Sequence, residues 1–446
     1  MTEAHTFTPV LHAKHGPKLR SSIHIMLFAR RKTPAGPTHD APAPLYDHLN
    51  LDPKLLVSFT TDTEGNWEYF RRFVERAEGL EWKGMGPSGY AADIELKDGW
   101  RFIFGGDAVD KGNAVGGSIR VVNSLLALKR RYPDRVTLLL GNRDLNKMRL
   151  TSELAPSELA PELLPMLDGP RWVPAAKRVT PEQYLRKLCA LRSNVEPDEV
   201  SAEQLAPMNT LANRMRYILK ETMGAEGELE RRSAELDELE ALGVDLTNLV
   251  VPRASSGEIA SLPSSGEIAS VERAVASFVV SVGEGGWMRE LIMKGELGVL
   301  SDETLFVHGG LISGRADYGL PPSVDEESNQ ADAFGHVPGR RGERFEQAVP
   351  WLHALSEWKH AAVTEWIRSP TWTWTSQIRP DQHALGTCTA SPAVQVDLDI
   401  GGGGGDMSKG HSPATLTRAR GGEALLNYSC PGQGSLVGRL IGSDCV

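Results

Sequence analysis

Four apolar segments of this 446-residue chain end in side chains that are common metal ligands. Asp62 and Glu64 follow the first segment, Asp107 the second, Asn142 the third and His308 the fourth. Carboxylate and amide oxygens suit hard or borderline divalent cations, and an imidazole suits manganese, iron, zinc or nickel. The four segment ends together therefore predict a metal centre.

Charged residues accompany these candidate ligands. Asp110 and Lys111 lie shortly after Asp107, and Arg143 follows Asn142 directly. Two divalent cations about 3.5–4 Å apart can share a bridging carboxylate and activate a hydroxide, which attacks phosphorus at neutral pH. Lys111 and Arg143 would neutralise the phosphoryl oxygens as charge develops there. The pattern predicts hydrolysis of a phosphate ester, with Lys111 and Arg143 binding the phosphate.

Strands and helices must bring these residues together. Apolar, β-prone runs cover residues 54–62, 100–107, 135–144 and 303–311. Apolar side chains at helical spacing cover 66–80 and 117–132 between them. Strands that alternate with helices predict an α/β domain, and the carboxyl ends of such strands converge on one crevice. Residues far apart in the chain are therefore expected to meet.

Composition narrows the class of protein. The net charge of −10 argues against a general nucleic-acid binder or a protein that binds anionic membranes. Four scattered cysteines without a CxxC pair favour a reducing compartment, so we expect a cytoplasmic protein. The apolar run Ile23–Ala29 is too short to span a bilayer. The basic first 39 residues fit an organelle-targeting segment or a solvated disordered extension, and we favour the extension.

The motifs, read in chain order, resemble a known superfamily. Gly-Asp-x-Val-Asp-Lys-Gly from Gly106, then Gly-Asn-Arg-Asp from Gly141, then Val-His-Gly-Gly from Val307 resemble calcineurin-like metallophosphoesterases. The Ser/Thr protein phosphatase branch and the diadenosine tetraphosphatases are nearest in style. The resemblance covers residues 54–150 and 275–315. It implies a central β-sandwich flanked by helices and two divalent metals, which are manganese, iron or zinc.

The resemblance also assigns roles to individual residues. Asp62 would bind the first metal, Asp107 would bridge both metals, and Asn142 and His308 would bind the second. Asp110 would orient the catalytic group. Lys111 stands where these enzymes usually have an arginine that grips the phosphate, and we expect the same role for Lys111.

Two positions depart from the family pattern. Glu64 replaces the histidine of the usual Asp-x-His motif, although a carboxylate can still bind a metal. Arg143 replaces the histidine that donates a proton to the leaving group. An arginine cannot donate a proton at pH 7, but it can hold a phosphate through two hydrogen bonds. Water or another residue would then protonate the leaving group.

A third departure concerns the carboxyl-terminal part of the chain. The family supplies further histidine ligands there in a Gly-His motif, and none follows residues 420–433. We therefore expect a truncated or altered carboxyl terminus that leaves the second metal short of ligands. Five histidines are candidates by type only: His336, His353, His360, His383 and His411. Of these, His353 and His360 lie on a predicted helix, and we expect them to pack or to face solvent.

The expected organisation has four parts. Residues 1–50 form a disordered extension, and 51–150 and 301–446 form the two halves of the metallophosphoesterase domain. Residues 151–300 form a mostly helical insertion, with a flexible loop at 253–270 where the sequence SSGEIAS occurs twice. An insertion of this length would cap the site and favour a small phosphorylated molecule or a nucleotide over a phosphoprotein. The alternative is a degenerate, non-catalytic member that binds metal or phosphate and acts through partner contacts.

Overall fold

The computed structural model describes residues 49–51, 54–170, 173, 175–251, 266–310, 335, 337–340, 343, 345–376, 394–395, 415–429 and 436–437. Most of the expected amino-terminal extension lies outside these residues. The same holds for 252–265 of the expected flexible loop, for much of 301–446, and for His336, His383 and His411. Residues 266–270, expected in that loop, instead form the first turns of a helix.

A three-stranded parallel sheet forms the amino-terminal half of the fold. Its order is β2 (Leu56–Thr60), β5 (Trp100–Phe104) and β6 (Val136–Leu138). Phe59 pairs with Ile103, and Phe104 pairs with Leu138. The strands predicted over 54–62, 100–107 and 135–144 are thus confirmed in their central residues. Because the strands are parallel, their carboxyl ends lie at one edge of the sheet.

Two helices follow the first two strands of this sheet. Helix α1 (Trp67–Arg76) begins where the Asn66 side chain accepts a hydrogen bond from the Tyr69 N–H, a standard N-cap. Helix α2 (Ser118–Arg131) follows β5, and its inner face buries Ile119, Val122 and Leu125. An antiparallel hairpin of β3 (Leu80–Met85) and β4 (Ala92–Leu96) lies between α1 and β5 in the chain.

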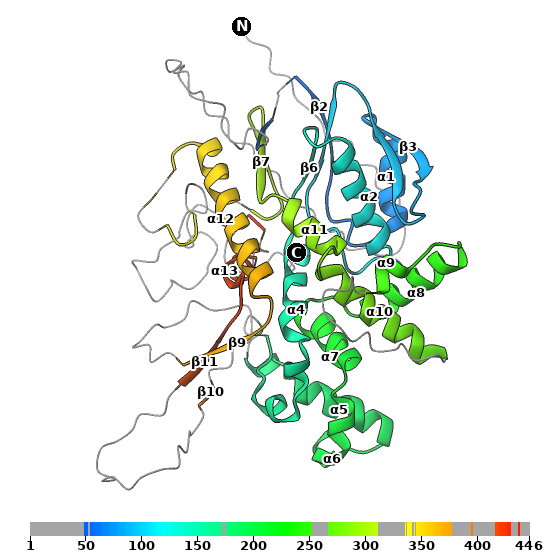
Figure 1. The fold of residues 1–446 in the computed structure, drawn as a ribbon, viewed down its shortest axis with the longest axis vertical. Helices are drawn as coiled ribbons and strands as arrows, with labels where there is room; N and C mark the ends of the chain where they lie inside the picture. The colour runs from blue at the N-terminus through cyan, green and yellow to red at the C-terminus, as the bar shows by residue number, and fades with distance from the viewer. Residues whose placement is uncertain are drawn as a thin grey trace.

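A second three-stranded sheet brings the distant His308 next to the first. Its order is β1 (Asn50–Leu51), β7 (Gly298–Ser301) and β8 (Thr304–Val307). A parallel bridge between Leu139 and Glu296 joins the chain after β6 to the chain before β7. A small apolar cluster contains residues from both sheets, namely Leu51, Ile103, Leu139, Val299 and Phe306. The strand predicted over 303–311 is β8, and Figure 1 shows β7 beside β6.

The described residues between 142 and 294 are mostly helical. A short segment of α3 (Asn142–Asn146), η2 (Lys147–Arg149) and α4 (Leu150–Glu153) leaves β6. The elements that follow it are η3 (Pro156–Leu159), η4 (Pro161–Met166), η5 (Ala175–Lys177), α5 (Pro181–Ser193), η6 (Pro197–Glu199), α6 (Ala202–Leu205), η7 (Ala206–Met208), α7 (Leu211–Tyr217), the π-helix η8 (Ile218–Thr222), α8 (Glu228–Ala241), α9 (Thr247–Val250), α10 (Gly266–Val282) and α11 (Trp287–Lys294).

Helix α8 docks on the amino-terminal end of α2. The fully buried carboxylate of Glu235 accepts the N–H groups of Ile119 and Arg120, at 3.2 and 3.1 Å. These donors would otherwise be unsatisfied, because Gly117 offers no side chain to cap α2. Leu242 lies just beyond the end of α8 and is 68 % exposed.

The carboxyl-terminal elements complete the described structure. Helix α12 (Ala348–Arg368) buries Trp351 and Trp366. An antiparallel sheet has the order β10 (Val394–Gln395), β11 (Thr415–Ala419) and β9 (Thr373–Ser376), and α13 (Glu423–Tyr428) follows it. Figure 1 shows this sheet below α12. The described part of the chain is therefore a mixed α/β fold, and none of its helices is both long and apolar enough to cross a membrane.

Candidate metal centre

Three strand ends bring together the ligand atoms of a metal site. Asp62 follows β2, Asp107 follows β5 and His308 follows β8, and one ligand atom from each lies within 4.8 Å of the other two. The N–H at Nδ1 of His308 donates to the carbonyl of Gly105 at 2.9 Å. That bond leaves Nε2 facing Oδ1 of Asp107 at 3.4 Å. A hydrogen bond of this kind fixes the ring orientation and tautomer that a metal-binding histidine needs.

Two glycines allow the strand ends to approach so closely. A Cβ atom at Gly106 would lie 2.7 Å from the backbone nitrogen of Gly141 and 2.8 Å from Nδ1 of His308. A Cβ atom at Gly141 would lie 2.1 Å from Oδ1 of Asp107. Real Cβ atoms do not come this close to other heavy atoms. Both positions therefore need glycine, and the Gly-Gly-Asp and Gly-Asn sequences have a direct steric reason.

The loops that carry the candidate residues have an unusual backbone. Five of the seven described non-glycine residues with positive φ are predicted site residues, namely Asp62, Glu64, Asp107, Asp110 and Lys111. Such a conformation costs about 1–3 kcal/mol per residue and persists only where the surroundings enforce it. Backbone hydrogen bonds do so here: Asp62 donates to Gly106 at 3.0 Å, and Glu64 donates to Asp107 at 2.9 Å. Strain concentrated in this way is typical of functional sites.

The buried carboxylate of Asp144 joins the loops that follow β5 and β6. It accepts three backbone N–H groups, from Gly141, Asp107 and Ala108, each at 2.9 Å. Burial and the charge of Asp107 raise the pKa of Asp144 to about 7. The contact with Gly141 also caps α3. Asp144 thus fixes the second and third strand ends relative to each other.

Asn142 offers a further candidate ligand. It is the first residue of α3, directly after the third strand end. Its Oδ1 atom is buried and has no hydrogen-bond partner in the described part of the structure. An unsatisfied buried acceptor costs about 1–3 kcal/mol, so an amide oxygen in this position calls for a partner. A bound cation would satisfy it.

Glu64 contacts the two candidate phosphate-binding cations. Its Oε1 atom lies 3.0 Å from Nζ of Lys111 and 3.0 Å from Nε of Arg143. Lys111 is half-exposed, whereas Arg143 is almost fully buried. Arg143 also lies 3.5 Å from Asp107 and 3.8 Å from Asp110. The structure therefore places Glu64 with the cations, and the group formed by Asp62, Asp107 and His308 does not include it.

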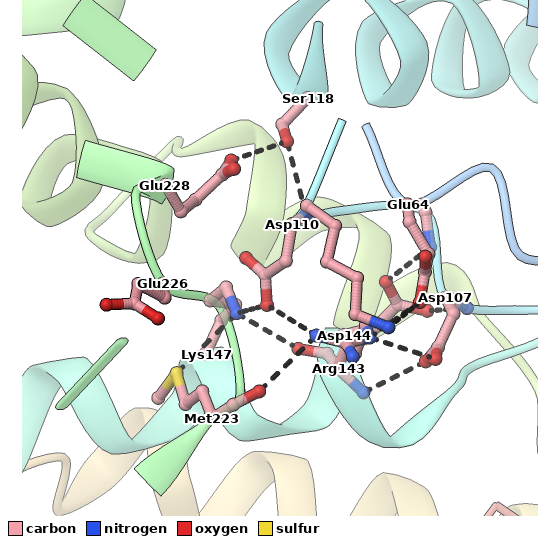
Figure 2. Close-up of polar contacts among 12 residues, drawn as sticks. Glu64, Asp107, Asp110, Ser118, Arg143, Asp144, Lys147, Met223, Glu226 and Glu228 are labelled. Carbon is pink, nitrogen blue, oxygen red and sulfur yellow. Dashed lines mark hydrogen bonds and ion pairs between the residues drawn. The ribbon is translucent and has the colours of Figure 1, made fainter. Parts of the chain in front are cut away.

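Lys147 is a site residue that the sequence reasoning missed. Its Nζ atom donates to Oδ2 of Asp110 at 2.6 Å, and both side chains are buried (Figure 2). Lys147 also donates to the carbonyl of Arg143 at 3.3 Å. The sequence did contain a signal for Lys147, because it stands four residues after Arg143 and residues at this spacing share one face of a helix. The other carboxylate oxygen of Asp110 has no hydrogen-bond partner among the described residues.

Two contacts connect the site to the helices of residues 142–294. The carbonyl of Met223 accepts a hydrogen bond from Nη1 of Arg143 at 3.3 Å. The hydroxyl of Ser118 accepts the N–H of Asp110 at 3.3 Å and donates to the carboxylate of Glu228 at 3.0 Å. Figure 2 shows Glu228 and Met223 on the side of Asp110 away from Glu64. Burial and the charge of Asp110 raise the pKa of Glu228 to about 7.

Mutual charge interactions dominate the centre. Burial acts to raise the pKa of Asp107, but His308 and Arg143 hold it well below its usual range. Burial acts to lower the pKa of His308, but Asp107 and then Asp62 raise it to about 9. Without a cation, His308 is therefore protonated at neutral pH. Because a metal binds the neutral imidazole, metal binding would release this proton.

Two of the remaining candidate histidines lie on α12. The ring N–H at Nδ1 of His360 donates to the carbonyl of Ser356 at 2.7 Å, within the same helix. Neither His353 nor His360 belongs to the described group of metal-ligating side chains.

Comparison of the chain with family models, with curated proteins and with solved structures found no match. Function is therefore inferred from the geometry of the site.

Proposed function

We propose that this chain is a metal-dependent phosphoesterase of the calcineurin-like type. One observation carries the proposal: Asp62, Asp107 and His308 converge from three strand ends, with ligand atoms within 4.8 Å of one another. Two cations, Arg143 and Lys111, lie next to this group and share the carboxylate of Glu64. A cluster of metal ligands beside positively charged donors fits a phosphate ester as substrate.

The residues present fit divalent cations. Two carboxylates, an imidazole of fixed orientation and the orphan amide oxygen of Asn142 form a mixed oxygen and nitrogen set, which suits manganese, iron or zinc. When bound, two such cations would supply an activated hydroxide. In our proposal Asp62 would hold the first cation, Asp107 would contribute to both, and Asn142 and His308 would hold the second. Glu64, the other predicted ligand, instead positions Lys111 and Arg143.

The side chains of the site have distinct roles in the proposed reaction. Arg143 and Lys111 bind the phosphoryl oxygens, and Arg143 can do so through two parallel hydrogen bonds. Asp110 and Lys147 form a buried ion pair that holds the segment carrying Arg143. Arg143 stays protonated at neutral pH, so it stabilises charge and does not transfer a proton. The leaving group then takes its proton from water.

The arrangement of the sheets and helices supports the finer parts of the proposal. The two sheets joined through Leu139 and Glu296 would correspond to the central sandwich of this superfamily. The carbonyl of Met223 accepts a hydrogen bond from Arg143. The carboxylate of Glu228 is linked to Asp110 through the hydroxyl of Ser118. A site lined in this way by the insertion favours a phosphorylated small molecule or a nucleotide as substrate.

The test is hydrolysis of an aryl phosphate in the presence of Mn²⁺. We expect turnover by the full chain, its loss with a chelator, and its loss in Asp107→Asn. The matched control is Asp98→Asn, because Asp98 precedes the opposite end of β5 and its side chain is fully exposed. Equal activity of Asp107→Asn and Asp98→Asn would overturn the proposal.

A second candidate is a non-catalytic metal-binding or phosphate-binding module of the same fold. The observation that favours it is Arg143, which occupies the position of the expected proton donor and is engaged by Glu64. This alternative predicts metal binding that depends on Asp107, with no turnover of any aryl phosphate. The activity assay on metal-loaded protein therefore separates the two candidates.

A further inference from the structure

A cluster of arginines lies outside the candidate metal centre. Arg149 of η2, Arg214 of α7, Arg418 of β11 and Arg420 just after β11 are all buried. Three of them, Arg149, Arg214 and Arg418, line a cavity of about 40 Å³. Thr222, Tyr217 and Trp372 line the same cavity, together with three carboxylate residues, Glu153, Glu158 and Asp168. None of these residues belongs to the proposed catalytic machinery.

Carboxylates balance three of the four guanidinium groups. Arg149 binds Glu153 through two hydrogen bonds, at 2.7 and 2.9 Å. Arg420 binds Glu423 at 2.7 Å and also contacts Glu153 at 3.3 Å. The partner of Arg418 is Glu158.

Arg214 is the unbalanced member of the cluster. Its side chain is 3 % exposed, and its Nε and Nη1 atoms are buried without a hydrogen-bond partner among the described residues. Burial lowers the pKa of Arg214, and the charge of Arg418 lowers it further, against the opposing effect of nearby carboxylates. A buried cation without a hydrogen-bonded partner is costly, so this position calls for an anion.

The aromatic ring of Trp372 orders the cluster. The guanidinium carbon of Arg418 lies 4.6 Å from the ring centroid, and that of Arg420 lies 4.3 Å from it. Such stacking contributes a favourable cation–π interaction and restricts the orientation of both groups. The donors around the cavity are therefore held in place before any ligand binds.

We propose that this cavity binds a small tetrahedral oxyanion of the phosphate class. One buried water needs about 10–15 Å³ of cavity volume, so this cavity of about 40 Å³ accepts a group the size of a few waters. Guanidinium groups present paired donors that match phosphate oxygens. The unpaired donors of Arg214 would bind the anion, and Arg149 and Arg418 would face it across the cavity. This proposal is independent of the phosphoesterase activity.

The segment between the cavity and the metal centre is short. The hydroxyl of Thr222, at the end of η8, accepts a hydrogen bond from Arg149 at 2.9 Å. The carbonyl of the next residue, Met223, accepts one from Arg143 at 3.3 Å. Phosphate binding must therefore be tested separately from phosphate held by Arg143.

Calorimetric titration with inorganic phosphate, in metal-free buffer, tests the proposal. The protein titrated is the full-length chain with Arg143→Met, a substitution that removes the main phosphate-binding cation of the metal centre. We expect binding to persist in Arg143→Met and to weaken by about tenfold or more when Arg214→Met is added. The control is Arg216→Met in the same background, because Arg216 lies on α7 but pairs with Glu230 outside the cavity. Equal affinity of the Arg214 and Arg216 variants would overturn the proposal.

Thermal unfolding provides a second readout. Because Arg214→Met removes an unpaired buried charge, we expect it to raise Tm in phosphate-free buffer and to abolish the increase that phosphate gives. A variant that unfolds without phosphate would show that Arg214 is structural and would overturn the proposal.

Discussion

At the scale of single residues, Asp107 links most parts of the candidate site. Its Oδ1 atom accepts the N–H of Arg143 at 3.0 Å and lies 3.4 Å from Nε2 of His308. Its backbone N–H donates to Asp144. The same carboxylate therefore belongs to the ligand group, to the cationic side of the site and to the hydrogen bonds that shape the loop. A change at Asp107 affects all three.

The pKa of His308 predicts a pH dependence of stability in the metal-free chain. The folded pKa is raised from 6.5 to about 9, so the ion pair with Asp107 is fully stabilising below pH 6.5 and is lost as pH rises through 9. The expected loss of free energy of unfolding is on the order of 3 kcal/mol. Urea unfolding at several pH values, with a chelator present, measures it. His308→Gln should lack this loss, and an identical pH profile in that variant would refute the assignment.

Lys147 is predicted to be structurally essential. Removing it in Lys147→Met leaves Asp110 buried without its main cation, which typically costs about 3–5 kcal/mol of unfolding free energy. Lys83→Met is the control, because Lys83 forms exposed ion pairs with Glu81 and Glu95 and such pairs contribute about 0–1 kcal/mol. Urea unfolding compares the two variants. Similar losses of unfolding free energy in both variants would show that the buried ion pair contributes no more to stability than the exposed pairs.

At the scale of elements, the strands and their polar ends were predictable. Alternating apolar runs located β2, β5, β6 and β8, and the residues after them carry the chemistry. The grouping of Asp62, Asp107 and His308 followed from the convergence of strand ends, although β8 belongs to a second sheet. Local sequence periodicity contains this information because strand and helix positions repeat at short intervals.

Other features depend on contacts between distant segments. The four-residue spacing of Arg143 and Lys147 places both on one helix face, but it does not show that Lys147 pairs with Asp110. Nor does the sequence show that Glu228 accepts a hydrogen bond from Ser118. The position of Glu64 against Arg143 also required the structure, because the family pattern favoured a metal ligand there. The cluster around Arg214 likewise joins α7 to β11, which are some 200 residues apart. Burial of charged side chains is the common reason, since a sequence does not show which charges lose solvent.

The close approach of the strand ends makes a prediction for Gly141. In Gly141→Ala the new Cβ would meet Oδ1 and the backbone nitrogen of Asp107, at 2.1 and 2.4 Å, so the loop must shift. We expect a loss of about 1–3 kcal/mol in unfolding free energy and a loss of metal binding. Gly283→Ala is the control, because its Cβ would make only ordinary contacts at 3.4 Å or more. Mn²⁺ titration and urea unfolding check both variants, and unchanged metal binding in Gly141→Ala would contradict this role.

At the scale of the whole molecule, the buried cations at both candidate sites contrast with the negative net charge of the chain. The chain carries −10 overall, yet the two candidate sites hold buried cations: Arg143 and Lys147 at one, and Arg149, Arg214 and Arg418 at the other. Buried cations at defined places can still attract anionic ligands in a chain of negative net charge. The segment from α3 to α4 carries cations of both sites, so its position matters to each.

Metal content is the measurement that tests the central claim most directly. The full chain, Asp107→Asn and Asp98→Asn are loaded with Mn²⁺, freed of excess metal and analysed by mass spectrometry. The proposed centre predicts about two ions per chain in the full protein and in Asp98→Asn, with a clear loss in Asp107→Asn. Absence of bound metal in the full protein, or equal content in all three proteins, would contradict a metal centre at these strand ends.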